Sequence, residues 1–198
     1  MVPNALPEDF VKRLNPDPEA AFERKTVLML GSLKGYKGTK EFILLSQRMP
    51  QYRFVLVVND TQENIDKYLT DESFTYGENL ELYSRQDDVA RFYQQASVVL
   101  NLSDKRLAIE TFGLTALEAM SAGLPVIVPT EGGIAEMVTD GVNGYKIDMT
   151  DLDGIERRVE GLLSDREGYE RMADEALHRA RQYDAEAMIA AVMNELKL

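Results

Sequence analysis

The sequence predicts an α/β fold, a doubly wound, Rossmann-like parallel sheet with extra C-terminal helices, as a single domain over residues 1–198. Short runs of Val, Leu and Ile alternate with segments of helical period, as in strands joined by crossover helices. The runs lack polar alternation, so helices should cover both faces of the sheet. With 198 residues, 44% of them hydrophobic, the chain can bury such a core.

The expected elements of the sheet follow one another at short intervals. The strand TVLMLG (26–31) leads through a loop to the helix TKEFILLSQRM (39–49), and RFVLVVN (53–59) leads to a helix around ENIDKYL (63–69). Right-handed crossovers would wind these units into one sheet. The remaining units are NLELYS, DDVARFYQQA, SVVLNL, a helix that begins near Phe112 or Gly113, PVIVP and GIAEMVTDG.

After NGYKI (143–147) the pattern becomes entirely helical. The three segments are DLDGIERRVEGLL, REGYERMADEALHRARQ and DAEAMIAAVMNELKL. We expect them to pack over an edge or a face of the sheet. His178 lies within the second segment and is interpreted as an ordinary half-exposed helix residue.

Composition excludes several classes of function. A formal net charge of −12 argues against a nucleic-acid partner, because phosphate backbones are bound by an excess of Lys and Arg. The absence of cysteine and the single histidine argue against thiolate chemistry and a histidine metal site, so no metal ligands are assigned. No apolar run is long enough to span a bilayer, and the start MVPNALPEDF does not read as a signal peptide. We expect a cytoplasmic protein.

The loop GSLKGYKG (31–38), after the first strand, is a candidate phosphate site. Ligands of open α/β sheets bind beyond the carboxyl ends of the strands. Here glycines let the backbone approach a ligand, a helix begins directly afterwards, and Lys37 adds a full positive charge. The loop is neither G-x-G-x-x-G nor a P-loop, which argues against NAD binding and ATP hydrolysis. The alternative is a turn with solvated lysines.

The stretch ETFGLTALEAM (110–120) carries two carboxylates in a segment that otherwise reads as a core helix. Glu110 would lie in the loop before the helix, and Glu118 in its second turn, on the face of Thr115 and away from the core stripe formed by Leu114, Leu117 and Leu124. We therefore expect Glu118 to face a cleft, where hydroxyl groups of a sugar or ribose would be natural donors to it. The alternative is that both are ordinary surface carboxylates.

Two glycines mark a third loop, TEGGIAEMV (130–138), where they again bring the backbone close to a cleft. Glu136 in this loop is interpreted as a charge matched to the start of a helix rather than as a site residue.

The segment ETFGLTALEAMSAGLPVIVP, followed by GG and DGVNG, resembles the C-terminal, donor nucleotide-sugar-binding domain of the family-4 retaining glycosyltransferases, which have the GT-B fold. Glu110 and Glu118 match the E-x7-E motif of that family. VPNALPEDF resembles the start of this domain, GSLKGYKG its first phosphate loop and DAEAMIAAVMNELKL its closing helix. The resemblance covers nearly the whole chain.

The resemblance implies a role for each matching residue. Glu110 would be the catalytic residue, near the reacting centre of the donor sugar, and Glu118 would bind the ribose hydroxyls. Lys37 would neutralise the diphosphate leaving group, so that no metal or other cofactor is required. Gly113 at the start of the helix would by itself expose the amides of Phe112, Gly113, Leu114 and Thr115 to an anion. The resemblance implies that the amides around Gly113 and Leu114 hold the β-phosphate and sugar hydroxyls.

The base would lie beside a loop after the third strand, formed by Ser84, Arg85 and Gln86. One position departs from the family pattern, because many relatives have an arginine where this chain has Ser32. Either Lys34 or Lys37 compensates for this change, or the diphosphate is held less tightly.

The resemblance also implies a second domain. A GT-B enzyme has two Rossmann-like domains, and its N-terminal domain binds the acceptor, whereas this chain starts where the second domain starts. We expect a donor-binding half that takes a UDP- or GDP-sugar, relies on an absent N-terminal domain for a glycan or lipid-linked acceptor, and transfers no hexose alone. The full-length enzyme could lie at the inner face of the membrane.

Three alternatives remain. One is another GT-B enzyme, such as a sugar-nucleotide epimerase or a glycogen-synthase-like transferase. A second is a non-catalytic nucleotide-binding or scaffold module. The third is a dinucleotide-dependent oxidoreductase with Asp60 as the acid that binds ribose, which the missing glycine fingerprint disfavours.

Overall fold

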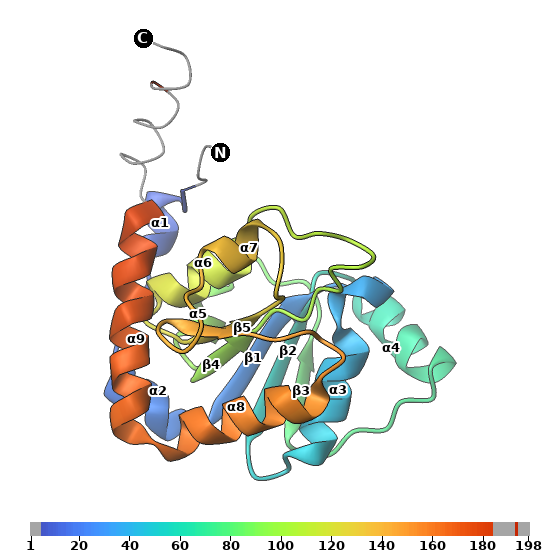
Figure 1. Ribbon diagram of the computed structural model, residues 1–198. Helices are drawn as coiled ribbons and strands as arrows, with labels where there is room; N and C mark the ends of the chain where they lie inside the picture. Colours follow the sequence, from blue (N-terminus) through green and yellow to red (C-terminus); the bar gives the residue numbers. More distant parts are fainter. Residues whose placement is uncertain (1–4, 184–192, 194–198) are drawn as a thin grey trace.

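A computed structural model describes residues 5–183 and residue 193 of the chain. Its strands form one sheet, all parallel, in the order β3-β2-β1-β4-β5-β6 (Figure 1). The order reverses between β1 and β4, which confirms the doubly wound, Rossmann-like prediction. The strands are β1 (Thr26–Gly31), β2 (Arg53–Val58), β3 (Leu80–Tyr83), β4 (Val98–Leu100), β5 (Val126–Val128) and β6 (Gly144–Lys146).

The central strand β1 fixes the register of the sheet. It pairs with β2 over its whole length, from Thr26 opposite Arg53 to Gly31 opposite Val58, and with β4 through Val27 opposite Val98. Val27 and Leu28 are completely buried, as expected for strands covered on both faces. The carboxyl ends of β1, β2 and β4 therefore meet at one edge, where the winding reverses.

Helices flank this sheet (Figure 1). Along the chain, α9 packs against α2 and α6, and α8 packs against α9 and α3, so the predicted C-terminal helices do cover the sheet region. The closing segment DAEAMIAAVMNELKL lies outside the described residues except for Met193. The helices are α1 (Glu8–Val11), α2 (Pro18–Arg24), α3 (Thr39–Arg48), α4 (Gln62–Asp71), α5 (Ala90–Tyr93), α6 (Leu114–Ser121), α7 (Gly133–Glu136), α8 (Leu152–Ser164) and α9 (Arg166–Ala180), with 3-10 turns η1 (Gly35–Lys37) and η2 (Arg181–Tyr183).

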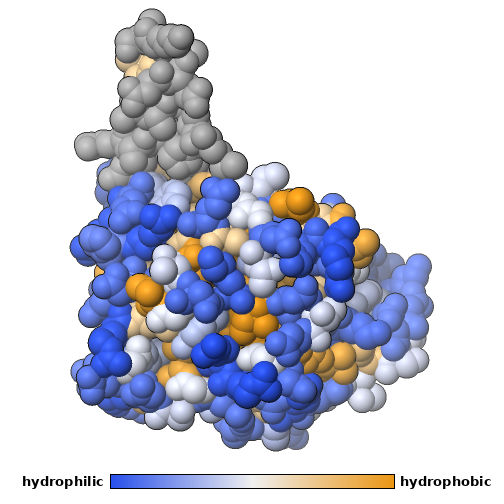
Figure 2. All heavy atoms as spheres, in the orientation of Figure 1, coloured by the Kyte–Doolittle hydropathy of each residue, from blue (hydrophilic) through white to orange (hydrophobic). Residues whose placement is uncertain are grey.

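Apolar side chains are concentrated in the interior, and the surface seen in Figure 2 is mostly hydrophilic with hydrophobic side chains interspersed. None of the helices in the described part of the chain combines the length and apolarity that crossing a membrane requires.

The structure differs from the sequence interpretation in three places. Leu114 is 46% exposed rather than part of the core stripe, because α6 begins at this residue and its first turn faces the sheet edge, whereas Leu117 and Leu124 are buried. The helix expected over DDVARFYQQA is reduced to the short α5. His178 is exposed rather than half-exposed, in the last turn of α9.

Candidate functional site

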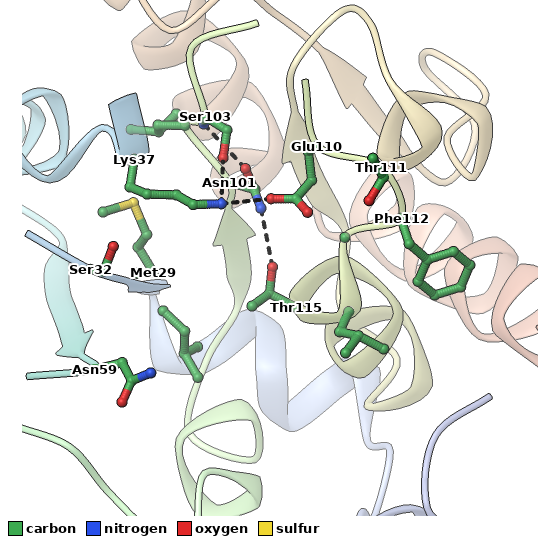
Figure 3. A pocket seen from close by; sticks show the side chains of 15 residues that line it. Met29, Ser32, Lys37, Asn59, Asn101, Ser103, Glu110, Thr111, Phe112 and Thr115 are labelled. Atoms are coloured by element: carbon green, nitrogen blue, oxygen red, sulfur yellow. Dashed lines mark hydrogen bonds and ion pairs between the residues drawn. The ribbon is translucent and has the colours of Figure 1, made fainter. Parts of the chain in front are cut away.

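A pocket of about 490 Å³ opens at the carboxyl edge of the sheet, where β1, β2 and β4 end (Figure 3). Its walls come from two predicted loops. The loop after β1 supplies Ser32 and Lys37, and the segment before and at the start of α6 supplies Glu110, Thr111, Phe112, Gly113, Leu114 and Thr115. The structure thus brings the predicted phosphate loop and the first carboxylate of the E-x7-E motif into one cavity.

An ion pair crosses this pocket. The ammonium group of Lys37 lies 2.7 Å from Oε2 of Glu110 and also donates to the hydroxyl of Ser103 at 3.5 Å (Figure 3). The two ion-paired side chains are 29% and 22% exposed, so they are partly shielded from water. The amide of Asp104 donates to the carbonyl of Tyr36 at 2.8 Å and ties the lysine loop to the loop after β4.

The start of α6 forms the opposite wall. Gly113 caps this helix in a left-handed conformation with φ of +80°, and a Cβ there would lie 2.4 Å from Cγ1 of Ile134. Only glycine therefore fits without displacing its neighbour. The first amides of a helix have no partner within it, and they carry partial positive charge. The start of α6 therefore presents free N–H groups at the pocket wall.

A close backbone contact holds the Glu110 loop in place. A Cβ on Gly133 would lie 1.8 Å from the carbonyl oxygen of Thr111, so α7 begins directly against the segment that precedes α6. The glycine pair in TEGGIAEMV thus brings its backbone close to the loop that carries Glu110. Glu136 is exposed at the end of α7 and does not line the pocket.

Three polar residues of the pocket were missed in the sequence. Asn59 follows β2 and Asn101 follows β4 directly, and Ser103 is two residues further on. Asn101 donates to the hydroxyl of Thr115 at 3.2 Å and accepts from the amide of Ser103 at 3.2 Å, so it links the end of β4 to the first turn of α6. Asn59 and Asn101 could have been found from the sequence, because each is a polar residue immediately after a buried strand, at the edge of the sheet where ligands bind.

Glu118 lies one turn beyond Thr115 and is not among the residues that line this pocket. Its side chain is partly buried, and Oε2 accepts a hydrogen bond of 2.5 Å from the hydroxyl of Tyr93, a fully buried residue of α5. Burial raises the pKa of the Glu118 carboxyl, and the hydrogen bond from Tyr93 offsets this in part. Burial and the neighbouring carboxylate likewise raise the pKa of Tyr93, so its hydroxyl keeps its proton and remains a donor.

The other predicted residues lie outside the pocket lining. Lys34 is exposed, and Ser84, Arg85 and Gln86 follow β3. Nε of Arg85 donates to Oδ1 of Asn59 at 2.8 Å, which connects this loop to a pocket residue. Gln86 accepts from Arg91 at 2.5 Å. The loop after β3 therefore forms a border beside the pocket rather than a wall of it.

The pocket has the chemistry of an anion site with an adjoining polar region. A cation and free helix amides suit an oxyanion, and the carboxylate and hydroxyls suit hydroxyl groups of a ligand. Within residues 5–183, no three His, Asp or Glu side chains come together in a way that could hold a metal ion.

Comparison with known sequences places this geometry in a family. Residues 12–179 match the family model described as glycosyl transferases group 1. The sulfoquinovosyl transferase SQD2 of Arabidopsis thaliana is 25% identical over 177 residues, which cover 87% of this chain and 33% of that protein. The chain thus spans about a third of the length of this relative.

Solved structures share the fold. Anabaena HepE in complex with UDP-glucose superposes with a TM-score of 0.77 at 20% identity, over 94% of this chain and 55% of that one. The C-terminal domain of the group 1 glycosyl transferase LpcC of Francisella tularensis superposes with a TM-score of 0.70 at 20% identity, over 88% of this chain and 98% of that domain. The chain belongs to the group 1 glycosyl transferases and has the fold of the C-terminal domain of a GT-B glycosyltransferase.

Proposed function

We propose that the chain is the donor-binding half of a retaining hexosyltransferase of family 4. It would bind a nucleotide diphosphosugar, a UDP- or GDP-sugar, and the whole enzyme would move the hexose to a glycan or lipid-linked acceptor with retention of configuration. The observation that carries this proposal is the pocket in which Lys37, Glu110 and the start of α6 face one another.

The chemistry of the leaving group explains why these residues would be needed together. When the bond between the sugar and the diphosphate breaks, negative charge grows on the β-phosphate. A cation and preorganised helix amides at that point stabilise the transition state more than the ground state, which is what accelerates a reaction. Lys37 and the amides at Gly113 and Leu114 would supply this stabilisation without a metal ion or other cofactor.

The remaining residues would bind the rest of the donor. Glu110 would contact the donor sugar near its reacting carbon, and Glu118 would accept hydrogen bonds from ribose hydroxyls. The loop of Ser84, Arg85 and Gln86 beside the pocket would border the base. Many family-4 relatives have an arginine at the position of Ser32, which lines the pocket here without a charge. Lys34 lies outside the pocket lining, so Lys37 would be the cation that holds the diphosphate.

The acceptor would be bound by another domain, so this chain alone should bind donor and transfer nothing. Support comes from the coverage, because the chain aligns with about half of HepE, the protein described in complex with UDP-glucose. We place the enzyme in the cytoplasm. Detectable transfer by the 198-residue chain to an added glycan acceptor would contradict the division of labour proposed here.

Calorimetric titration with UDP, GDP and ADP tests the donor site. One nucleotide should bind saturably, and Lys37→Ala and Glu118→Ala should each weaken it by about tenfold, as expected for losing a hydrogen bond or ion pair to a charged group. Lys67→Ala removes the same charge from the exposed face of α4 and should leave the affinity unchanged. Failure of all three nucleotides to bind the unmodified chain would refute the proposed donor site.

A further inference from the structure

Tyr93, a buried tyrosine, is hydrogen-bonded to Glu118, the second carboxylate of the E-x7-E motif. Tyr93 has no exposed surface, and its ring packs edge-on against Phe10 with centroids 6.1 Å apart. Its hydroxyl reaches Oε2 of Glu118 at 2.5 Å, across the contact between α5 and α6. A ring enclosed on all sides cannot follow the carboxylate if the carboxylate moves. The tyrosine is therefore the fixed partner of the pair.

The hydrogen bond from Tyr93 occupies one carboxylate oxygen of Glu118 and leaves the other available to a ligand. Among the described residues, Glu118 accepts this side-chain hydrogen bond through Oε2, and none is found at Oε1. A carboxylate has lone pairs on both oxygens, so Oε1 keeps its capacity to accept from a ligand. Thr115, one turn earlier on the same helix, lines the pocket, so Glu118 follows a pocket residue along α6.

We propose that Tyr93 is a positioning residue for donor recognition: by holding Oε2 it fixes the side-chain torsions of Glu118 so that Oε1 is presented to the vicinal hydroxyls of the ribose. This inference rests on the proposed function, in which Glu118 binds ribose. Without the tyrosine hydroxyl, Oε2 would lack its donor in a partly buried place, and the side chain would turn toward water to regain one. The carboxylate would then lose its preset orientation.

The test compares, by calorimetric titration, two ligands that differ by one hydroxyl, a nucleoside diphosphate and its 2′-deoxy form. The pair is UDP and 2′-deoxy-UDP, and GDP and 2′-deoxy-GDP replace them throughout if GDP is the nucleotide that binds. The unmodified chain should prefer UDP by about tenfold, and Glu118→Ala should abolish this preference. Tyr93→Phe should reduce the preference to about threefold or less while leaving the ratio of UDP to UMP affinity unchanged, because the phosphate contacts of Lys37 are untouched. A merely structural role would weaken both uridine diphosphates equally.

Tyr169→Phe is the matched control. Tyr169 is also completely buried, and its hydroxyl donates to the carbonyl of Ser97 at 2.6 Å, at the opposite, amino end of β4. This variant also loses a buried hydrogen bond and should show a comparable drop in urea midpoint, but it should keep the full preference for UDP. Both phenylalanine variants keep the aromatic ring, so the packing should be preserved, and far-ultraviolet circular dichroism together with the urea transition can verify that each folds.

A double-mutant cycle separates the two ways of failing. In the Glu118→Ala background, Tyr93→Phe should have no further effect on UDP affinity, because the two residues act as one unit. If Tyr93→Phe keeps the full preference for UDP, or its effect adds to that of Glu118→Ala, the positioning role is wrong while the donor site stands. If no nucleotide binds, or Glu118→Ala leaves the preference intact, the proposed ribose role fails and this inference fails with it.

Discussion

Replacing Glu110 by glutamine should tighten the binding of UDP. The carboxylate and the proposed diphosphate compete for the same ammonium group of Lys37, which lies 2.7 Å from Oε2 of Glu110. A hydrogen bond between charged groups contributes about 1.5–3 kcal/mol when shielded, and partial exposure of both side chains reduces this to about 1 kcal/mol. Removing the competitor should therefore lower the Kd for UDP by about fivefold at low ionic strength.

Titration calorimetry of Glu110→Gln against the unmodified chain measures this change. Glu131→Gln is the control, because Glu131 pairs with Lys105 at 2.6 Å and does not line the pocket, so its removal should leave the Kd for UDP unaltered. Added salt should shrink the gain, since screening weakens the ion pair and the phosphate contact alike. Equal or weaker binding of UDP by Glu110→Gln would show that the carboxylate does not compete for Lys37, and would refute the reasoning.

Three further results are expected. UDP affinity should fall as the pH is lowered through the pKa of Glu118, which burial raises, and Glu118→Gln should remove that step; titrations between about pH 5 and 8 would show whether the two proteins differ. A carboxyl with a raised folded-state pKa contributes stability below its unfolded pKa and loses it as the pH rises through the folded pKa. Glu118→Gln should therefore raise the urea midpoint at about pH 7 but not at about pH 4. An effect of the same size at both pH values would contradict this. Gly113→Ala should lower the free energy of unfolding by about 1–3 kcal/mol, whereas Gly161→Ala, in open space on α8, should raise it by up to about 1 kcal/mol; equal effects would remove the case for strain at Gly113.

The sheet could be predicted because its signals are local. TVLMLG and RFVLVVN are continuous apolar runs next to amphipathic segments, and their strands appear as β1 and β2 at nearly the expected bounds. Short elements were harder to predict from the sequence. DDVARFYQQA has helical spacing, but only Ala90–Tyr93 forms a helix, because the two aspartates precede it and the chain then turns into β4.

Local sequence patterns could not predict which residues meet in the pocket. Lys37 and Glu110 are 73 residues apart, and only the parallel pairing of β1 with β4 brings their loops together. The same applies to Tyr93, which reads as one more apolar position of a helix until α6 packs beside it. Leu114 fits the spacing of a core stripe, yet it begins its helix at the edge of the sheet and is half exposed.

The placement of β1 between β2 and β4 has a consequence for how the chain matures during synthesis. The lysine loop emerges from the ribosome before the carboxylate loop and α6, which follow only after β2, β3 and β4 have been made. A nascent chain that ends before α6 therefore carries Lys37 without the opposite wall of the pocket, so the proposed nucleotide site is incomplete. Pairings between distant strands form late in folding, so capture of a nucleotide would mark a domain that has completed its assembly, and would protect that form alone from proteolysis.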